Sequence, residues 1–251
     1  MVPIFGWYNC YLVTRIYRLH KYTHTLLASV LSKYILRTTH EDKVYEMLYL
    51  IVGVVSYLIG SLSFAYIVSR IMRLPNPRDY GSGNAGATNV LRTGNKKAAY
   101  LVLLGDLMKG VLVVLAAKEY SFYANDPNVL IGISAVFVFL GHLFPIFFNF
   151  KGGKGVATSA GILLAVEFNI GLLAITVWLL VAFLTRYSSL AALMAAFASF
   201  ITTLVMAINL PIVFSIGSIF ILILIRHKQN IKQLITGDES KISLSSSSSA
   251  K

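Results

Sequence analysis

The sequence has few charged residues and almost no cysteine. Only 13% of its 251 residues are charged, whereas 57% are hydrophobic and the mean hydropathy is +0.72. A soluble domain has about 25% charged residues, so this chain has more apolar surface than a soluble core can hide. The single cysteine, Cys10, excludes an internal disulfide framework and a metal site built from several cysteines. These shortages disfavour a soluble enzyme, a disordered scaffold and a secreted disulfide protein, and they predict an integral membrane protein.

Seven apolar segments predict an all-α protein with seven transmembrane helices, some of them short. A helix crosses about 30 Å of hydrocarbon in roughly 20 residues. The stretch 156–185 would extend about 45 Å as one helix, too long for an upright crossing, so we divide it at the polar residues Glu167 and Asn169. Pro211 begins the last segment. The seven predicted helices are residues 47–72, 98–117, 130–148, 156–166, 170–185, 188–208 and 212–225.

Acidic residues are scarce, and the distribution of basic residues predicts the orientation. The chain has 22 Lys and Arg against 10 Asp and Glu, a net charge of +12. Basic residues gather in Arg70–Lys97, in Lys151 and Lys154, at Arg186, and in the stretch that begins at Arg226. With seven helices, all these places fall on one side, which the positive-inside rule makes cytoplasmic. We therefore expect the N-terminus outside and the C-terminus in the cytoplasm.

The two ends of the chain differ from the rest. Residues 1–46 carry six basic and three acidic residues, a net +3, on the side predicted to be outside. We expect that this segment is an extension of doubtful origin, from an upstream choice of start codon; the alternative is an amphipathic surface segment or partial extra helix. Residues 47–242 then form a single membrane-embedded domain. The serine-rich residues 243–251 are predicted to be a disordered tail.

The densest polar stretch is Arg78–Arg92. Gly81, Gly83 and Gly86 match a dinucleotide-binding pattern in spacing, but that pattern requires a preceding strand, and here an apolar helix is predicted instead. Glycines let backbone N–H groups converge, which suits a phosphate or an oxyanion. The side chains that add donors or charge are Ser82, Asn84, Thr88, Asn89 and Arg92. The alternative is an ordinary solvated loop.

A second glycine-rich stretch, Lys151–Gly155, lies just before a predicted helix. Gly155 follows Lys154 where a nucleotide-hydrolysing P-loop has Ser or Thr, so that function is disfavoured. The loop still has features that favour the binding of an anion: two ammonium groups, a helix N-terminus, and the glycines Gly152 and Gly153. The alternative is that the two lysines serve membrane topology alone.

Further polar residues lie in or beside the apolar segments. Asp106 and Lys109 are three residues apart and are expected to pair. His142 is more simply explained as a structural residue, and Gly60 as a place of close helix packing. In the C-terminal stretch that begins at Arg226, a helix would place His227 and Asn230 on one face, although a basic membrane anchor is equally compatible. We expect no metal, because the chain has no His/Cys cluster.

From about residue 47 to residue 242 these strings resemble, in the same order, the bacterial acyl-phosphate-dependent glycerol-3-phosphate acyltransferases, the PlsY family. The matching strings are Gly60-Ser61 with Phe64, Gly81–Arg92, Asp106 with Lys109-Gly110, Gly141-His142 with Phe144-Pro145, Phe150–Thr158, Arg186-Tyr187 with Ser189-Leu190, and His227–Glu239. Members are inner-membrane proteins with seven helices and an external N-terminus. Ser63, where members often have Pro, and the serine tail depart from the pattern.

The resemblance implies transfer of a fatty acyl group from acyl phosphate to the 1-hydroxyl of glycerol 3-phosphate, which gives lysophosphatidic acid and phosphate. It implies Ser82, Arg92, Lys154 and His227 as catalytic residues. The implied substrate contacts are Gly81, Gly83, Asn84, Thr88, Asn89, Gly152, Gly153, Gly155, Asn230, Gly237 and Glu239. We expect an active site that faces the cytoplasm, surrounding membrane lipid, no cofactor and no nucleic-acid partner. The soluble acyl-ACP:phosphate acyltransferase that makes the donor is a candidate partner.

Two mechanisms and two other functions stay open at this point. Ser82 can attack to give an acyl-enzyme, or the acceptor hydroxyl can attack the activated donor directly, which we favour. The general base is His227, Glu239 or the donor's own phosphate. An anion transporter would instead spread polar residues through the bilayer midplane. A non-catalytic anchor for the soluble enzyme would tolerate changes at Ser82 and Arg92.

Overall fold

The computed structural model describes residues 42–242, which contain helices and turns and no strand. The chain divides into two compact units, Met1–Met47 and Leu48–Lys251. Of the first unit, residues 42–47 are described and are helical. The predictions of an extension over 1–46 and of a disordered tail over 243–251 otherwise fall outside the described residues. All that follows concerns the second unit.

Helical residues 48–60 begin the second unit. The elements that follow are α2 (Phe64–Ile71), α3 (Ala87–Leu91), α4 (Lys96–Tyr120), η1 (Ser121–Tyr123), α5 (Pro127–Leu143), η2 (Ile146–Phe148), α6 (Val156–Val166), α7 (Phe168–Thr185), α8 (Ser188–Val205), α9 (Leu210–Arg226) and α10 (Lys228–Thr236). Each predicted apolar segment contains a helix.

Five helical segments within 42–242 are long and apolar enough to cross a membrane, and a sixth is reached if α9 and α10, bent by 56° at their junction, count as one. The all-α class is therefore confirmed, whereas seven crossings remain a prediction. Helix α6, with 11 residues, is the short apolar helix that the seven-crossing count requires.

The first predicted helix, 47–72, is wrong as a continuous element because it breaks at residues 61–63. The Ser61 hydroxyl donates to the Tyr57 carbonyl at 2.8 Å, and the Leu62 carbonyl accepts from the Lys109 ammonium at 2.8 Å instead of from a following turn. Gly60, just before the break, packs so closely against the Val138 carbonyl of α5 that a Cβ would overlap it. Close packing at Gly60 was correctly predicted.

Local sequence accounts for the other helix ends. Pro127 occupies the first turn of α5, where its missing N–H costs nothing, and the Asp126 carboxylate caps the free amide of Asn128 at 2.8 Å. The Asn95 side chain caps α4 by accepting from the Ala98 amide at 2.9 Å. Glu167 has extended backbone, which separates α6 from α7 at the predicted polar break.

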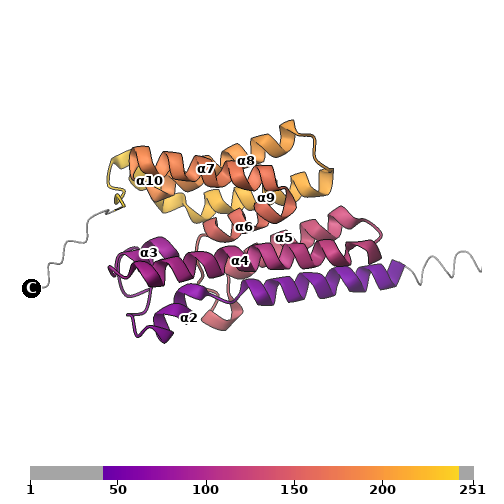
Figure 1. The fold of residues 1–251 in the computed structure, drawn as a ribbon, viewed down its shortest axis with the longest axis horizontal. Helices are drawn as coiled ribbons and strands as arrows, with labels where there is room; N and C mark the ends of the chain where they lie inside the picture. The colour runs from indigo at the N-terminus through magenta and orange to yellow at the C-terminus, as the bar shows by residue number, and fades with distance from the viewer. Residues whose placement is uncertain (1–41, 243–251) are drawn as a thin grey trace, which may run out of the picture. The chain divides into compact units, whose positions relative to one another are not determined.

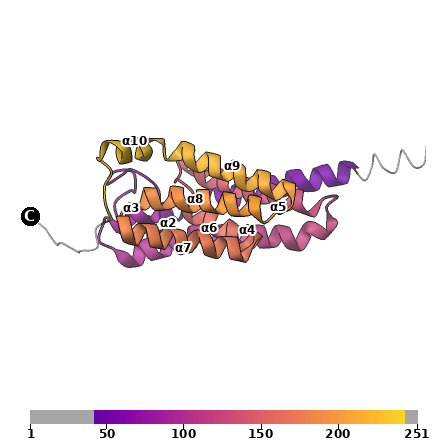
Figure 2. The ribbon, with the colours of Figure 1, turned by 90° about the horizontal axis from the view of Figure 1, so that it is seen from above.

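The helices of the unit lie side by side, with α4 in contact with α2, α5 and α6 (Figure 1). Helix α7 packs between α6 and α8, and α9 packs on α5 and α8. The main hydrophobic core includes Val114, Phe139 and Ile162 from α4, α5 and α6. Two views at right angles place α3 and α10 at the same end of the unit (Figures 1 and 2). Most of the predicted site residues belong to the elements at this end.

Candidate functional site

Asn89 organises the first glycine-rich stretch. Helix α3 occupies the second half of this stretch, and Asn89 lies on that short helix. Gly81 and Gly83 adopt positive φ angles of 60° and 64°, which only glycine reaches without strain. The buried Asn89 side chain accepts from the Ser82 amide at 2.9 Å and donates to the Pro77 carbonyl at 2.7 Å. Its side chain is engaged within the protein, so it fixes the place of Ser82.

Ser82 is exposed, and its hydroxyl donates to the side-chain oxygen of Asn89 at 3.3 Å. Arg92 is also exposed, and its guanidinium donates to the Ser240 hydroxyl at 2.6 Å. The Thr88 hydroxyl lies 3.3 Å from that of Ser188, at the start of α8. Residues predicted as anion donors therefore face the C-terminal segment and α8.

Hydrogen bonds hold the second glycine-rich stretch in place at its two central residues, Gly152 and Gly153. The amides of Gly152 and Gly153 donate to the Leu143 and His142 carbonyls, both at 3.2 Å. From the other side, the Arg226 guanidinium donates to the Gly153 carbonyl at 3.0 Å and to the Gly152 carbonyl at 3.1 Å. These bonds fix the loop because they take up the backbone groups of both glycines. Gly155, at φ 84°, leads into α6 as predicted.

Lys154 joins this loop to the C-terminal motif. Its ammonium donates to the Asn230 side-chain oxygen at 2.5 Å. The Asn230 amide nitrogen donates to both Glu239 oxygens, at 2.8 and 3.0 Å, and the Ser189 hydroxyl donates to the same carboxylate at 2.7 Å. Gly237, at φ 81°, turns the chain back after α10 so that Glu239 reaches this position. Three stretches far apart in sequence therefore meet in one hydrogen-bonded chain.

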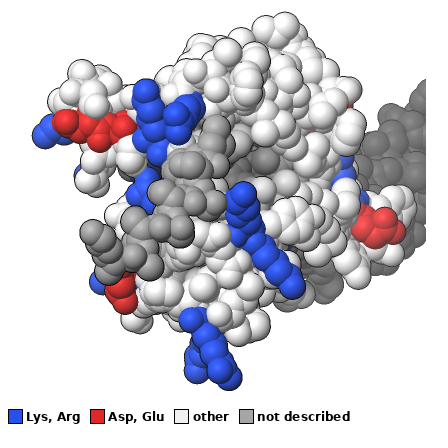
Figure 3. Space-filling view, turned by 60° about the vertical axis from the view of Figure 1, so that its left-hand side comes forward, with Lys and Arg blue, Asp and Glu red and all other residues white. Residues whose placement is uncertain are grey.

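Positive charge concentrates around Lys154. Burial lowers the pKa of its ammonium, the carboxylate of Glu239 raises it in part, and the guanidinium groups of Arg226 and Arg92 lower it further. Space-filling shows Lys and Arg side chains over the face that Figure 3 turns toward the viewer, with few acidic ones. An excess of cations around one carboxylate favours a bound anion.

His227 is buried at the junction of α9 and α10. Its Nδ1 lies 2.9 Å from the Ile223 carbonyl, so Nδ1 carries the proton in the neutral ring and Nε2 is the free acceptor. Burial lowers the pKa of His227 to about 4, despite this hydrogen bond. His227 is therefore neutral near pH 7, and its low basicity disfavours it as a general base.

Sequence reasoning assigned no site role to Arg226, Ser189 and Ser240. Arg226 was counted only for topology, and its hold on the glycine carbonyls has no sequence signal beyond its basic charge. Ser189 stands in one of the matching strings, so its position was marked but its contact with Glu239 was not. The ion pair of Asp106 and Lys109 is confirmed at 2.9 Å. Within residues 42–242, no cluster of three or more His, Cys, Asp or Glu side chains forms a metal site.

Comparison with known proteins gives consistent matches. Residues 50–237 match the family model described as glycerol-3-phosphate acyltransferase. A protein of Paraburkholderia phymatum with that name is 54% identical over 194 residues, which cover 77% of this chain and 92% of the relative. A protein of Cupriavidus taiwanensis with the same name is 51% identical over 197 residues, which cover 77% of this chain and 96% of the relative.

Two solved structures are similar throughout most of their length. Both are PlsY, described as an integral membrane glycerol 3-phosphate acyltransferase, and both are 36% identical to this chain. The glycerol 3-phosphate form has a TM-score of 0.73 and covers 78% of this chain and 96% of its own. The lysophosphatidic acid form has a TM-score of 0.71, and the match covers 77% of this chain and 94% of the solved chain.

Proposed function

The chain belongs to the glycerol-3-phosphate acyltransferase family, and from this membership we propose that it transfers a fatty acyl group from acyl phosphate to the 1-hydroxyl of glycerol 3-phosphate. The products are lysophosphatidic acid and phosphate, in the first acylation step of phospholipid synthesis. Structures of a relative in glycerol 3-phosphate and lysophosphatidic acid forms support the acceptor and the product. Family membership favours this enzyme over the transporter and the non-catalytic anchor.

One observation carries the proposal: the C-terminal motif meets both glycine-rich stretches among a group of cations. The Lys154 ammonium of the second stretch donates to Asn230, and the Arg92 guanidinium of the first donates to Ser240. The reaction requires two phosphorylated molecules to lie side by side. Their mutual repulsion is offset by fixed positive charge, which Arg92 and Lys154 supply directly. Preorganised donors also stabilise the oxyanion that develops on the acyl carbon.

We favour direct transfer as the mechanism. The acceptor's 1-oxygen forms a bond to the acyl carbon, the bond from that carbon to the phosphate oxygen breaks, and the hydroxyl proton passes to the departing phosphate. His227 is a weak base, and Glu239 already accepts three hydrogen bonds, so the donor's phosphate is the remaining base of those considered. Ser82 then serves as a donor to the reacting groups. Isolation of a covalent acyl-Ser82 intermediate would refute direct transfer.

Further predictions from the sequence complete the proposal. Asn84, Thr88, Gly81, Gly83, Gly155 and Gly237 contact substrate, beside Asn230 and Glu239. Gly152 and Gly153, whose backbone groups are bonded within the protein, instead hold Lys154 toward the substrate. The protein crosses the bacterial inner membrane seven times, with its N-terminus outside and its site facing the cytoplasm, since the basic residues gather there under the positive-inside rule. The acyl tail stays in lipid while its head enters the basic site. The soluble enzyme that makes acyl phosphate is the proposed partner.

Purified protein in lipid, supplied with acyl phosphate and glycerol 3-phosphate, tests the function. We expect phosphate release that requires both substrates and that fails in Arg92→Ala. Turnover with acyl-CoA but not with acyl phosphate would overturn the donor assignment. Phosphate movement across the bilayer without acyl transfer would instead favour a transporter.

A further inference from the structure

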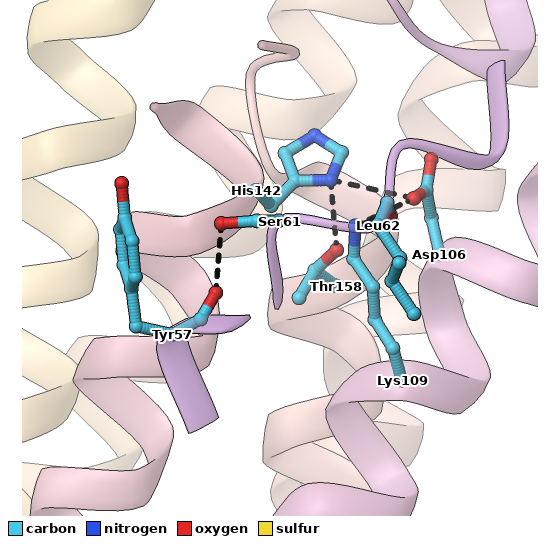
Figure 4. Close-up of polar contacts among 7 residues, drawn as sticks. All are labelled: Tyr57, Ser61, Leu62, Asp106, Lys109, His142 and Thr158. Carbon is cyan, nitrogen blue, oxygen red and sulfur yellow. Dashed lines mark hydrogen bonds and ion pairs between the residues drawn. The ribbon is translucent and has the colours of Figure 1, made fainter. Parts of the chain in front are cut away.

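A buried ion pair that the mechanism does not use lies in α4. Asp106 and Lys109 are 2% and 3% exposed, and their charged groups are 2.9 Å apart (Figure 4). A buried ion pair is often no more stabilising than well-packed apolar residues, because both charges lose their hydration. Stability alone therefore explains this pair poorly, and its other contacts are informative.

Each member of the pair holds a different part of the fold. The Lys109 ammonium donates to the Leu62 carbonyl at 2.8 Å, in the break before α2. The Asp106 carboxylate lies 3.4 Å from Nδ1 of His142, at the end of α5, and the same nitrogen lies 3.2 Å from the Thr158 hydroxyl of α6. The close-up shows these side chains converging from four segments (Figure 4).

His142 connects this buried cluster to the second glycine-rich loop, because it contacts both. Its Nε2 packs directly against Gly153, where a Cβ would overlap the ring. The His142 carbonyl accepts from the Gly153 amide at 3.2 Å, while Arg226 holds the carbonyl of Gly153 at 3.0 Å. The orientation of one imidazole ring thus determines where the residue before Lys154 lies.

We propose that Asp106, His142 and Thr158 are positioning residues for acyl transfer: they orient the imidazole against Gly153 so that Lys154 faces the phosphates. The inference rests on the proposed function, because it takes the Lys151–Gly155 loop as part of the anion site. A fixed support of this kind matters for rate and affinity, since a displacement of about 1 Å in a reacting group can cost roughly a hundredfold.

Thr158→Val tests the cluster, with Thr203→Val as its matched control. Both threonines are 0% exposed, and both variants lose one hydroxyl at nearly constant volume, but Thr203 donates only to Ser199 within α8. In Thr158→Val we expect KM for glycerol 3-phosphate or acyl phosphate to rise about fivefold, the effect of losing one ordinary hydrogen bond. We also expect faster hydrogen exchange at the Gly152 and Gly153 amides, which Thr203→Val should leave unchanged.

A role in general packing predicts equal effects of the two variants on KM and on loop exchange, and that result would overturn the proposal. The exchange measurement needs no turnover. If wild-type protein does not use acyl phosphate, the proposed function fails, whereas the loop measurement still decides the inference.

A double-mutant cycle tests the ring contact itself. Gly153→Ala places a methyl group against His142 Nε2 and also 2.7 Å from the Ala85 carbonyl. His142→Asn removes the ring nitrogen while it keeps a side-chain amide, so it relieves the first overlap and leaves the second. We expect the double variant to be more active than Gly153→Ala alone, so the two effects are not additive. Additive losses would show that the ring does not act on the loop through Gly153.

Discussion

The ammonium of Lys154 donates a hydrogen bond to the side-chain oxygen of Asn230, 76 residues further along the chain. This bond joins the glycine-rich loop before α6 to the helix that follows α9. It leaves the ammonium of Lys154 half-buried, near the guanidinium groups of Arg226 and Arg92 and the carboxylate of Glu239.

Replacement of this charge is the first prediction. Lys154→Met removes a preorganised donor, and we expect kcat/KM to fall about a hundredfold, as for loss of one oxyanion donor. Lys151→Met is the control, because Lys151 is exposed in the same loop and has the same side chain. Steady-state rates in lipid measure both. A loss of equal size in the two variants would show that overall loop charge, rather than the Lys154 contact, is required.

Replacement of Ser240 and replacement of Arg92 by alanine are expected to have different effects on activity. The hydrogen bond of 2.6 Å between these two side chains engages one of the five N–H donors of the guanidinium that we assign to phosphate, so substrate competes with Ser240 for only part of this group. Ser240→Ala should leave kcat unchanged and keep KM the same or lower it, within about twofold, because exposed hydroxyls contribute little. Arg92→Ala should cost about a hundredfold in kcat/KM. A large loss in Ser240→Ala would mean that the hydroxyl itself contacts substrate.

The low pKa of His227 predicts a dependence of stability on pH. Burial lowers this pKa from the usual 6.5 to about 4, so the unfolded chain takes up a proton at a higher pH than the folded one. The contribution of His227 is complete above pH 6.5 and is lost as pH falls toward 4, by up to about 3 kcal/mol. The unfolding temperatures of wild type and His227→Gln, followed in detergent from pH 7 to 4, should converge. Curves that stay parallel would contradict the buried neutral ring.

Close packing of the first helix against α5 predicts a contrast between two glycines. Gly60 meets the Val138 carbonyl, whereas a Cβ at Gly53 would meet only side chains at ordinary distances of 3.5 Å or more. Gly60→Ala should therefore destabilise the protein by about 1–3 kcal/mol, as overpacking does. Gly53→Ala, in the same helix, should be neutral or stabilising by up to about 1 kcal/mol. Thermal unfolding compares them directly, and equal shifts would argue against the close approach.

The sequence was sufficient for the apolar helices because runs of 11 to 25 apolar residues have few alternatives in a bilayer. It also marked the Glu167 break and the Asp106–Lys109 pair. It did not predict the break at 61–63, since the cause is Lys109, which comes from another helix. Sequence alone does not determine the number of membrane crossings, because short apolar helices such as α6 fall below the usual span length.

Polar motifs were easier to find than their contacts. Asn89 reads as an anion donor in the sequence, yet its amide bonds within its own loop. Arg226 has no distinctive neighbours in sequence, and its partners are the backbone of Gly152 and Gly153, which any residue would offer. Side-chain types therefore predicted the chemistry of the site, whereas the hydrogen-bond partners required the tertiary arrangement.

The turn at Gly237 has a consequence for biosynthesis. Chain synthesis runs from the N-terminus, so the residues that complete the site, Asn230 and Glu239, leave the ribosome after every apolar helix has been made. A chain cut after α9 would keep the membrane helices and both glycine loops but would leave Lys154 without its partner. The proposed site is thus completed last, and an incompletely synthesised chain would lack the contacts that assemble it.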